Sequence, residues 1–309
     1  MTHIGGPYVG RFAPSPSGPL HFGSLLAAVG SYLQARAAHG RWLLRIEDLD
    51  RPRVVAGAAD RIVHALAAFG FEWDGPIEYQ SRRLDQYSKA LDSLRAAGRI
   101  YACTCSRARI AAWHARQDGA EVDELRYPGI CREHVHAFDG ESAFRFHVRE
   151  GHVDFIDRIQ GPQSEDVAQI SGDFVVRRRD GIHAYHLAVV IDDAAQGITE
   201  VVRGADLLDS TSRHILLQRA LGVPTPAYCH LPVALDLSGR KLSKSTQSLS
   251  VDPAHAAAVL CQTLVALRQS PPPALKTGDL REIWEWAIRH WNLQPLRRLL
   301  TCAAPSAMG

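Results

Sequence analysis

Two short segments far apart in the chain carry residue types suited to binding phosphate. The first is Arg11-Phe-Ala-Pro-Ser-Pro-Ser-Gly-Pro-Leu-His-Phe-Gly-Ser24, which follows a strand-like run and leads into a helix-like run. Backbone N–H groups in such a loop, together with the helix N-terminus, can face an anion. Gly18 permits a close backbone approach, and His21 can donate a hydrogen bond to phosphate. Taken alone, the segment also fits an ordinary proline-rich turn with a capping role.

The second segment is Lys241-Leu-Ser-Lys-Ser245. Two lysines three residues apart can surround a triphosphate, and ammonium charge near the α-phosphorus stabilises the transition state of nucleotidyl transfer. Alone, this string also fits a surface loop. Because both segments occur in one chain in this order, they predict an ATP site. We expect His21 and Lys244 to act on the phosphates as catalytic groups, and the predicted ATP-binding residues are His21, Gly23, Ser24, Lys241 and Lys244.

A cluster of cysteines predicts a metal site. Cys103-Thr-Cys105 is followed by Cys131, and three thiolates suit a tetrahedral Zn²⁺ that needs one more ligand. Residue type alone favours a histidine, and the candidates are His114, His134 and His136. The alternative is three unliganded thiols in a reducing compartment. The remaining cysteines are isolated and are expected only to pack in the core.

The elements that must position these residues alternate between strand and helix. In the first hundred residues the runs are 8–13, 22–39, 42–46, 54–69, 77–80 and 84–97, and Gly40 is expected to cap the first helix. Alternation resumes after residue 172, with runs at 174–177, 186–195, 199–203 and 211–221. This order predicts an α/β protein with a parallel sheet and crossover helices.

The periodicity breaks between these two stretches. Clustered Cys, His and Arg are followed by short strand-like runs at 144–148 and 153–157, which indicates an inserted α+β subdomain. The tail has two helix-like runs, at 253–268 and 280–291. The predicted domains are a first catalytic half (1–100), the zinc-containing insert (101–172), a second catalytic half (173–237), and the lysine loop with a short helical region (238–309).

Composition favours a globular enzyme over a generally basic nucleic-acid binder. The 309 residues are 46% apolar and 22% charged, with a formal net charge of +2. Any RNA surface must therefore be a local patch, such as Arg177-Arg178-Arg179, although a solvated turn is the alternative. The N-terminus lacks the pattern of a signal peptide, and no apolar run approaches the ~20 residues of a membrane span. We expect a cytoplasmic protein.

Three further segments make the chain similar to a known family. They are Leu44-Arg-Ile-Glu-Asp-Leu-Asp50, Tyr185-His-Leu-Ala-Val-Val-Ile-Asp-Asp193 and Val201-Val-Arg-Gly-Ala-Asp-Leu-Leu208. With the two phosphate segments, they resemble the class I aminoacyl-tRNA synthetases of the glutamyl/glutaminyl branch, over the stretch from Tyr8 to Ser245. The resemblance implies a Rossmann-type catalytic domain that activates an amino acid with ATP.

The resemblance also implies the substrate, L-glutamate, and the residue types agree with it. Glutamate has two carboxylates, for which Arg11 and Arg203 offer guanidinium groups, and one ammonium, for which Glu47 offers an acid. Tyr185 can close the pocket with its ring and hydroxyl. The alternatives are a Glu47 that pairs only with a neighbouring arginine and a Tyr185 that is simple core. By resemblance, the glutamate-binding residues are Arg11, Phe12, Ala13, Pro14, Ser15, Glu47, Tyr185 and Arg203.

For the metal site the resemblance points away from histidine. Tyr127-Pro-Gly-Ile-Cys131 resembles an element in which the tyrosine is the fourth ligand. The implied ligands of one structural Zn²⁺ per chain are Cys103, Cys105, Tyr127 and Cys131.

Two departures from the family pattern narrow the expected function. The first phosphate element ends in Ser24, and only 64 of the 309 residues follow Ser245, too few for an anticodon-binding domain. Both match a tRNA-modifying branch of the family. The implied activity is a ligase that activates L-glutamate with ATP and Mg²⁺ independently of tRNA, then transfers it to queuosine at the wobble position of tRNA(Asp). Its partner is the anticodon stem-loop, and we expect a monomer without a membrane partner.

Three other functions stay open at this point. One is a truncated glutamyl-tRNA synthetase that charges the tRNA 3′ end. Another is a nucleotidyltransferase that makes a small-molecule amide through an acyl-adenylate. The last is a catalytically silent zinc- and RNA-binding module. Glutamate-dependent ATP–pyrophosphate exchange without RNA would favour the ligase.

Overall fold

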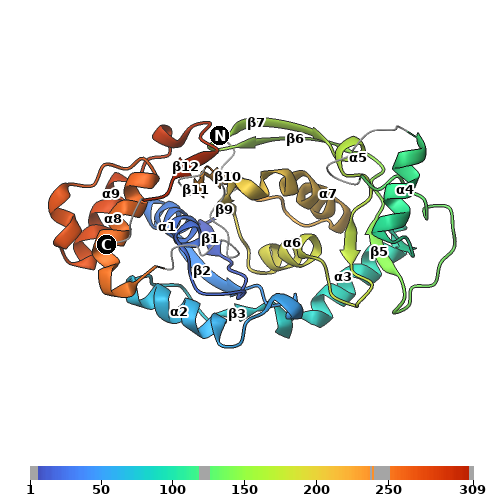
Figure 1. Ribbon diagram of the computed structural model, residues 1–309, viewed down its shortest axis with the longest axis horizontal. Coiled ribbons are helices and arrows are strands. Elements are labelled where there is room, and N and C mark those ends of the chain that lie inside the picture. Colours follow the sequence, from blue (N-terminus) through green and yellow to red (C-terminus); the bar gives the residue numbers. More distant parts are fainter. Residues whose placement is uncertain (1–5, 118–125, 237–238, 240–250, 306–309) are drawn as a thin grey trace.

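The computed structural model describes residues 6–117, 126–236, 239 and 251–305 (Figure 1). Its centre is a set of parallel strands: β1 (Val9–Phe12), β2 (Arg41–Ile46), β3 (Glu78–Tyr79), β9 (Glu200–Gly204) and β10 (Ala227–Leu231). β1 pairs with β2, β2 with β3, and β9 with β10, all in parallel. The two groups meet at β1 and β9, where the Thr199 N–H donates to the Val9 carbonyl over 2.9 Å. The predicted parallel α/β sheet is confirmed.

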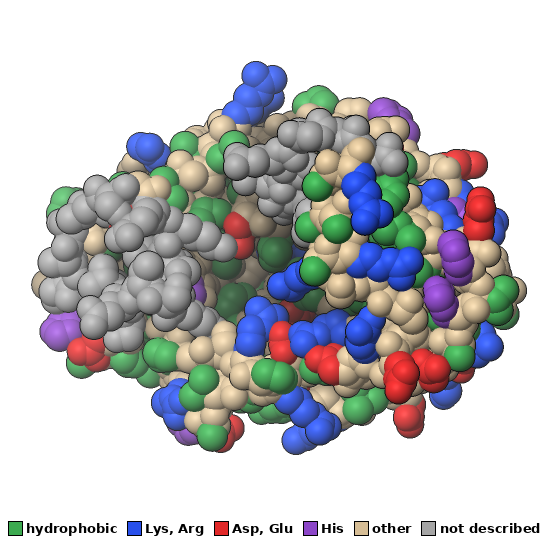
Figure 2. Space-filling model, turned by 45° about the vertical axis from the view of Figure 1, so that its right-hand side comes forward, with side chains coloured by type: hydrophobic (Ala, Val, Ile, Leu, Met, Phe, Trp, Pro, Cys, Tyr) green, Lys and Arg blue, Asp and Glu red, His purple; other side chains and the backbone are tan. Residues whose placement is uncertain are grey.

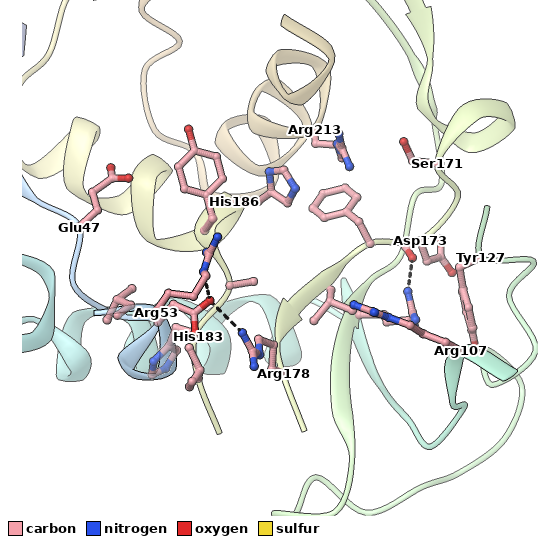
Figure 3. Close-up of a pocket in the computed structure, with 18 of the residues that line it drawn as sticks. Glu47, Arg53, Arg107, Tyr127, Ser171, Asp173, Arg178, His183, His186 and Arg213 are labelled. Atoms are coloured by element: carbon pink, nitrogen blue, oxygen red, sulfur yellow. Dashed lines mark hydrogen bonds and ion pairs between the residues drawn. The ribbon is translucent and has the colours of Figure 1, made fainter. Parts of the chain in front are cut away.

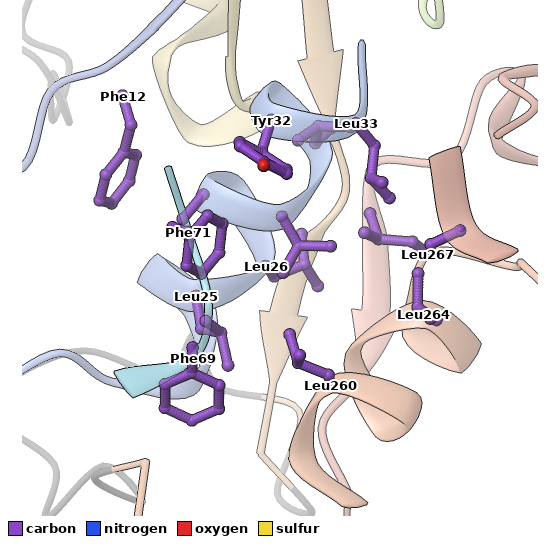
Figure 4. Close-up of a cluster of buried hydrophobic side chains, with 14 of the residues drawn as sticks. Phe12, Leu25, Leu26, Tyr32, Leu33, Phe69, Phe71, Leu260, Leu264 and Leu267 are labelled. Carbon is purple, nitrogen blue, oxygen red and sulfur yellow. The ribbon is translucent and has the colours of Figure 1, made fainter. Parts of the chain in front are cut away.

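Helices from the N-terminal part of the chain share one apolar core with the C-terminal region. α1 (Phe22–Ala37) connects β1 to β2, and α2 (Ala58–Ala68) leads toward β3. Leu26 and Leu33 of α1 belong to the same buried cluster as Leu260 and Leu264 of α8 (Ala256–Ala266), as Figure 4 shows. Trp284 of α9 (Leu280–His290) completes this core. The C-terminal region therefore packs against α1 and stabilises this helix, which begins at the end of the first phosphate segment.

The end of α1 differs in detail from the prediction. The helix stops at Ala37, and the left-handed residue is His39, with φ 51°. Gly40 is not the cap. A Cβ at Gly40 would lie 2.5 Å from the Tyr8 carbonyl oxygen, so the glycine is needed for the close approach of two chain segments.

A second apolar core lies against the other helices. It joins α3 (Leu84–Ala96), α6 (Tyr185–Ala195) and α7 (Thr211–Leu221) to β9 and β10 through residues such as Leu94, Leu187 and Leu216. α6 begins at Tyr185, whose hydroxyl accepts a hydrogen bond from Arg203 of β9 at 3.2 Å. This helix thus holds Tyr185 and its neighbours next to the ends of the parallel strands.

The inserted segment has its own small antiparallel sheet. β4 (Ile100–Cys103) pairs with β5 (Ala143–Phe146), and β5 with β8 (Val175–Arg177). α4 (Arg107–Gln117) and α5 (Val167–Ile170) flank it. β8 was expected in the second catalytic half, but its hydrogen-bonded partner is β5. The domain limits inferred from the sequence stay predictions.

One hairpin ties the insert back to the catalytic sheet. β6 (His152–Asp157) pairs with β7 (Gly161–Asp166) in antiparallel fashion, and its last residue, Asp157, lies in parallel register with Tyr228 of β10. The C-terminal region also contains a short parallel pair, β11 (Val233–Leu235) and β12 (Thr301–Ala303), which the sequence analysis did not anticipate. Among the helices that the structure describes, none is long and apolar enough to cross a membrane.

Candidate active site

A pocket of about 930 Å³ opens between the catalytic sheet and the insert. Glu47, which directly follows β2, lines it on one side, and Tyr127 of the insert on the other (Figure 3). His186 and Arg213, from the starts of α6 and α7, lie between them. This edge is formed by the carboxyl ends of parallel strands, where open α/β sheets bind ligands.

Two arginines and two acids form a buried network, and one of its members, Glu47, lines the pocket. Arg11 Nε donates to Asp193 Oδ1 over 3.1 Å, and Arg45 Nη1 donates to the same oxygen over 2.8 Å. Arg45 Nη2 then reaches Glu47 Oε1 at 3.3 Å. The Arg45 side chain is fully buried, and that of Glu47 is 9% exposed. Glu47 does pair with Arg45, as the alternative expected, and its role toward a ligand stays a prediction.

The network shifts the pKa values of its two acids in opposite directions. Burial alone would raise the pKa of Asp193, but Arg11 and Arg45 outweigh it and the pKa is lowered. For Glu47, burial is the larger influence, and its pKa is raised even though Arg45 and Arg11 oppose the shift. Asp193 is thus held as an anion between two cations, while Glu47, with its raised pKa, lines the pocket.

Arg203 is fixed by the protein through all five of its N–H groups. Nε donates to His230, Nη1 to the Tyr185 hydroxyl and to His214, and Nη2 to the Leu207 carbonyl and the Thr211 hydroxyl, at 2.8 to 3.3 Å. The guanidinium side chain is buried, 6% exposed. Arg203 therefore acts on the pocket through its charge and through Tyr185, whose hydroxyl accepts one of its hydrogen bonds.

The first phosphate segment forms the turn into α1. His21 is the N-cap residue, and its Nδ1 accepts a hydrogen bond from the Ser24 N–H at 3.3 Å. The capping role considered from the sequence is thus present. It leaves the other first-turn N–H groups, including that of Gly23, at the start of a long helix that can face an anion. The Glu47 N–H donates to the Pro14 carbonyl over 3.0 Å, which ties the loop of Phe12, Ala13, Pro14 and Ser15 to the end of β2. Lys241 and Lys244 lie outside the described residues.

The three predicted cysteines meet in the insert. The Sγ atoms of Cys103, Cys105 and Cys131 lie within 4.8 Å of one another, and the Tyr127 hydroxyl is 3.3 Å from Cys103 Sγ and 3.7 Å from Cys105 Sγ. The cluster is consistent with a metal site. Of the three histidine candidates, His114 has its Nε2 hydrogen-bonded to the Arg126 carbonyl at 2.5 Å, whereas the side chain of His136 hydrogen-bonds to Cys131. The choice between Tyr127 and a histidine as the fourth ligand stays a prediction.

The surroundings act differently on the members of the cluster. Burial raises the pKa of Cys105 to about 11 and also raises the pKa of Tyr127. Burial opposes ionisation of Cys131, but hydrogen bonds from Tyr127 and the Thr104 backbone lower its pKa to about 6. Arg145 Nε donates to Cys103 Sγ at 3.3 Å, and its guanidinium lies 3.7 Å above the Tyr127 ring. Three thiols and a phenol beside one cation are a donor set that fits Zn²⁺.

The rim of the pocket is basic. Figure 2 shows a hollow in the surface bordered by Lys and Arg side chains. Arg178 lines it and pairs with Asp50 and Asp180, so one member of the predicted arginine run does face the site. Arg177 and Arg179 contact the insert instead, at the Phe144 ring and the Thr104 carbonyl. The other arginines that line the pocket are Arg53, Arg107, Arg126, Arg145 and Arg213.

Sequence reasoning did not identify the residues that hold these groups in place. The missed residues are Asp157, Asp192, Asp193, His214 and His230, all of them buried. A signal was present for two of them, since Asp192 and Asp193 end an otherwise apolar helical run, where a solvated acid pair is out of place. Asp192 accepts hydrogen bonds from Gln80, Arg83 and Tyr87 and so fastens α3 to α6.

Comparison with known proteins assigns the family. Residues 8–260 match the family tRNA synthetases class I (E and Q), catalytic domain. The chain is 55% identical to the Glutamyl-Q tRNA(Asp) synthetase of Aromatoleum aromaticum over 97% of this chain and 94% of that protein. It is 55% identical to that of Dechloromonas aromatica over 94% of this chain and 96% of that protein, and 51% identical to that of Chromobacterium violaceum over 93% and 94%.

The solved structures agree on the fold. The glutamate-tRNA synthetase of Elizabethkingia anophelis superposes with a TM-score of 0.80 at 24% identity, covering 97% of this chain and 68% of that chain. The glutamate tRNA ligase of Elizabethkingia meningosepticum gives 0.79 with the same coverage. The expected class I catalytic fold is confirmed, and the chain belongs to the class I tRNA synthetases (E and Q), within the group of the Glutamyl-Q tRNA(Asp) synthetases.

Proposed function

We propose that this protein is a tRNA-modifying ligase of the cytoplasm that acts as a monomer. It activates L-glutamate with ATP in the absence of tRNA and transfers the glutamyl group to queuosine at the wobble position of tRNA(Asp). The observation that carries the proposal is the 55% identity, over 97% of this chain, to a Glutamyl-Q tRNA(Asp) synthetase. The arrangement of the pocket supports it.

In this proposal, glutamate lies against Arg11, Glu47, Tyr185 and Arg203. Glu47 lines the pocket, and its carboxylate attracts the ammonium group. Arg11 and the Arg203–Tyr185 pair give positive charge and hydrogen-bond donors for the carboxylates. Ser15 lines the same pocket, and its loop is anchored to Glu47 through the Pro14 carbonyl.

Adenylation then needs phosphate contacts on the other side of the amino acid. The α-carboxylate oxygen attacks the α-phosphorus, the bond to the β-phosphate oxygen breaks, and pyrophosphate leaves. His21, Gly23 and Ser24 at the α1 N-terminus, together with Lys241 and Lys244, meet the phosphate charge. Mg²⁺ accompanies the triphosphate as part of the substrate.

Transfer uses the same pocket. A queuosine hydroxyl attacks the glutamyl carbonyl carbon, the mixed anhydride bond breaks, and AMP leaves with its phosphate able to take up the hydroxyl proton. The arginine-lined rim gives an anticodon stem-loop a cationic approach. Cys103, Cys105, Tyr127 and Cys131 would hold one Zn²⁺, which supplies structural cross-linking of the insert rather than chemistry at the substrate.

The decisive experiment identifies the product. Purified protein is incubated with [¹⁴C]glutamate, ATP and tRNA(Asp) that contains queuosine, and the RNA is digested with nuclease and analysed by mass spectrometry. Glutamate on the queuosine nucleoside supports the proposal. Glutamate on the terminal adenosine overturns it in favour of 3′ charging, and ATP–pyrophosphate exchange that fails without RNA overturns the tRNA-independent activation.

Lys244→Ala is expected to lower the rate of glutamate-dependent ATP–pyrophosphate exchange about 10²-fold, since a preorganised charge at the transferring phosphate is lost. Lys89→Ala, at an exposed position of α3, serves as the matched control and should leave the rate unchanged. A Lys244→Ala rate close to that of the unsubstituted protein would contradict the role given to this lysine.

Cys103→Ser is expected to release the bound zinc and to lower the melting temperature by about 5 °C, because a structural metal contributes folding free energy directly. Zinc content by mass spectrometry and thermal unfolding measure the two effects. Cys302→Ser in β12, away from the cluster, controls for the loss of a buried thiol. Full zinc content in Cys103→Ser would speak against its role as a ligand.

A further inference from the structure

A chain of hydrogen bonds runs from the end of β6 to the wall of the pocket. Asp157 Oδ2 lies 2.6 Å from His230 Nδ1, and His230 Nε2 lies 3.0 Å from Arg203 Nε. On the other side, Arg203 Nη1 lies 3.3 Å from His214 Nδ1, and His214 Nε2 lies 3.1 Å from His186 Nδ1. Asp157, His230 and His214 are almost fully buried, and His186 lines the pocket.

The arginine at the centre determines where every proton in this chain lies. A guanidinium group only donates, so both imidazole nitrogens that face Arg203 must be unprotonated acceptors. His230 then carries its proton on Nδ1 and donates to Asp157. His214 carries its proton on Nε2 and donates to His186. Since His186 Nδ1 is thereby an acceptor, His186 carries its own proton on Nε2.

The three histidines are neutral in this arrangement. Burial lowers the pKa of His186 to about 3, with Arg213 and Arg203 adding to the shift, and it lowers the pKa of His214 well below its usual range. Burial also lowers the pKa of His230, although Asp157 opposes the shift. A neutral imidazole has one donor and one acceptor, so the tautomer of each of these three histidines is determined by its hydrogen-bond partners.

Two hydrogen-bond donors are turned toward the pocket as a result. His186 Nε2 has no partner among the described residues, and Figure 3 places its ring at the pocket wall. The Tyr185 hydroxyl accepts from Arg203 Nη1 at 3.2 Å, so its own proton also turns away from the arginine. His186 and Tyr185 are consecutive residues of the first turn of α6.

We propose that His186 is a specificity-determining residue that selects a side-chain carboxylate over a carboxamide in the amino acid substrate. Its Nε2–H, fixed by Arg203 through His214, donates to an acceptor oxygen. Both oxygens of a carboxylate accept, whereas one end of a carboxamide is an NH₂ group that would face an N–H. A site built to donate rejects such an analogue because buried polar groups are left unpaired. This inference rests on the proposed use of glutamate.

Two substitutions of His186 distinguish the effect of its hydrogen-bond donor from the effect of its side-chain packing. In His186→Asn the amide oxygen lies near the former Nδ1 and can still accept from His214, but no donor reaches the pocket. In His186→Gln the longer amide can place an N–H near the former Nε2, and it can also turn its oxygen to a carboxamide. ATP–pyrophosphate exchange is measured for both variants with glutamate and with glutamine.

We expect His186→Asn to raise KM for glutamate about 10-fold, with a smaller change in kcat, and to lower the ratio of kcat/KM for glutamate over glutamine by a similar factor. His186→Gln should restore KM for glutamate while the ratio stays low. An unchanged KM and ratio in His186→Asn would overturn the inference. Equal loss in both variants, with no change in the ratio, would also overturn it and assign His186 a packing role.

The tautomers can be observed without any substrate. Long-range ¹H–¹⁵N correlation spectra of protein labelled with ¹⁵N-histidine should show Nε2–H forms for His186 and His214 and an Nδ1–H form for His230, assigned by single substitutions. An Nδ1–H form of His186 would sink the inference. If the unsubstituted protein shows no glutamate-dependent exchange while the tautomers are as expected, the proposed function fails, and the hydrogen-bond chain stands without its assigned substrate.

Discussion

Glu47→Gln is expected to lower kcat/KM for glutamate about 10³-fold, because removing one member of a desolvated charge pair costs about 4 kcal/mol. Glu47 follows β2 at the pocket wall, and its carboxylate contacts Arg45 Nη2 at 3.3 Å. Arg45 keeps Asp193 at 2.8 Å after the substitution, so the arginine does not lose its main partner. The charge that disappears is the one available to the substrate ammonium.

The direction in which the pKa of Glu47 shifts indicates that Glu47→Gln does not destabilise the folded state. Burial raises that pKa, with Arg45 and Arg11 opposing the shift. A carboxyl whose pKa is higher in the folded state binds its proton more tightly there, so the folded state loses stability as pH rises through that pKa. At neutral pH the ionised Glu47 is a cost to stability, and its neutral isostere removes that cost.

The measurement combines exchange kinetics with urea unfolding at pH 7. We expect reduced activity together with a free energy of unfolding equal to or above that of the unsubstituted protein. Glu78→Gln is the matched control, since this acid lies in β3 and reaches Arg83 only at 3.7 Å. Unaltered KM and kcat in Glu47→Gln would refute the assignment of the ammonium site.

Asp193→Asn is expected to lower the free energy of unfolding by about 3 kcal/mol, because it leaves two buried arginines without their shared counter-charge. The Asp193 carboxylate accepts from Arg11 and Arg45 at 3.1 and 2.8 Å, and the side chains involved are 8%, 3% and 0% exposed. The network joins β1, β2 and α6, so its loss loosens the elements that hold Glu47 at the pocket.

The contribution of Asp193 to the free energy of unfolding depends on pH with the opposite sign to that of Glu47. Burial opposes ionisation of Asp193, but Arg11 and Arg45 lower its pKa below the usual value. The stability that this group contributes is therefore present at neutral pH and is lost as pH falls through the lowered pKa. The difference in unfolding free energy between Asp193→Asn and the unsubstituted protein should accordingly shrink in strong acid.

Urea unfolding between pH 2 and 7 tests both statements, since this range extends well below the usual pKa of an aspartate. Asp154→Asn provides the control, since Asp154 is an exposed residue of β6 that contacts only neighbouring surface groups. The buried network would have no such role if Asp193→Asn unfolded at the same urea concentration as the unsubstituted protein at pH 7. Its activity should also fall, because Arg11 loses the group that orients it.

The sequence by itself determined the class of fold and the types of chemistry. Alternating periodicity indicated a parallel sheet, since strands and helices differ in the spacing of their apolar residues. The two phosphate segments and the three cysteines could be found from their residue types and spacing, whereas Glu47 and Tyr185 came from the resemblance to a known family. Periodicity and local motifs depend only on residues that are close together in the sequence, so the sequence alone reveals them.

The tertiary structure alone decided how these groups are held and which of their atoms are free. Arg11 meets Asp193 across 182 positions, and His230 meets Asp157 across 73. Such contacts depend on which strands become neighbours: β6 joins the catalytic sheet beside β10 although it follows the insert's own strands. Local periodicity carries no information on that pairing.

Tertiary contacts also decided which predicted side chains reach the cysteine cluster and which predicted donors are already engaged. Tyr127 and His136 both reach the thiols, while His114 is hydrogen-bonded to the Arg126 carbonyl, a difference that spacing along the chain could not show. Arg203 was identified from the family resemblance, with which its charge agrees, but only the folded chain shows that all five N–H groups are donated to protein atoms. Residue type determines what a side chain can do, and the surrounding donors and acceptors, brought together by topology, determine which of those capacities remains for a substrate.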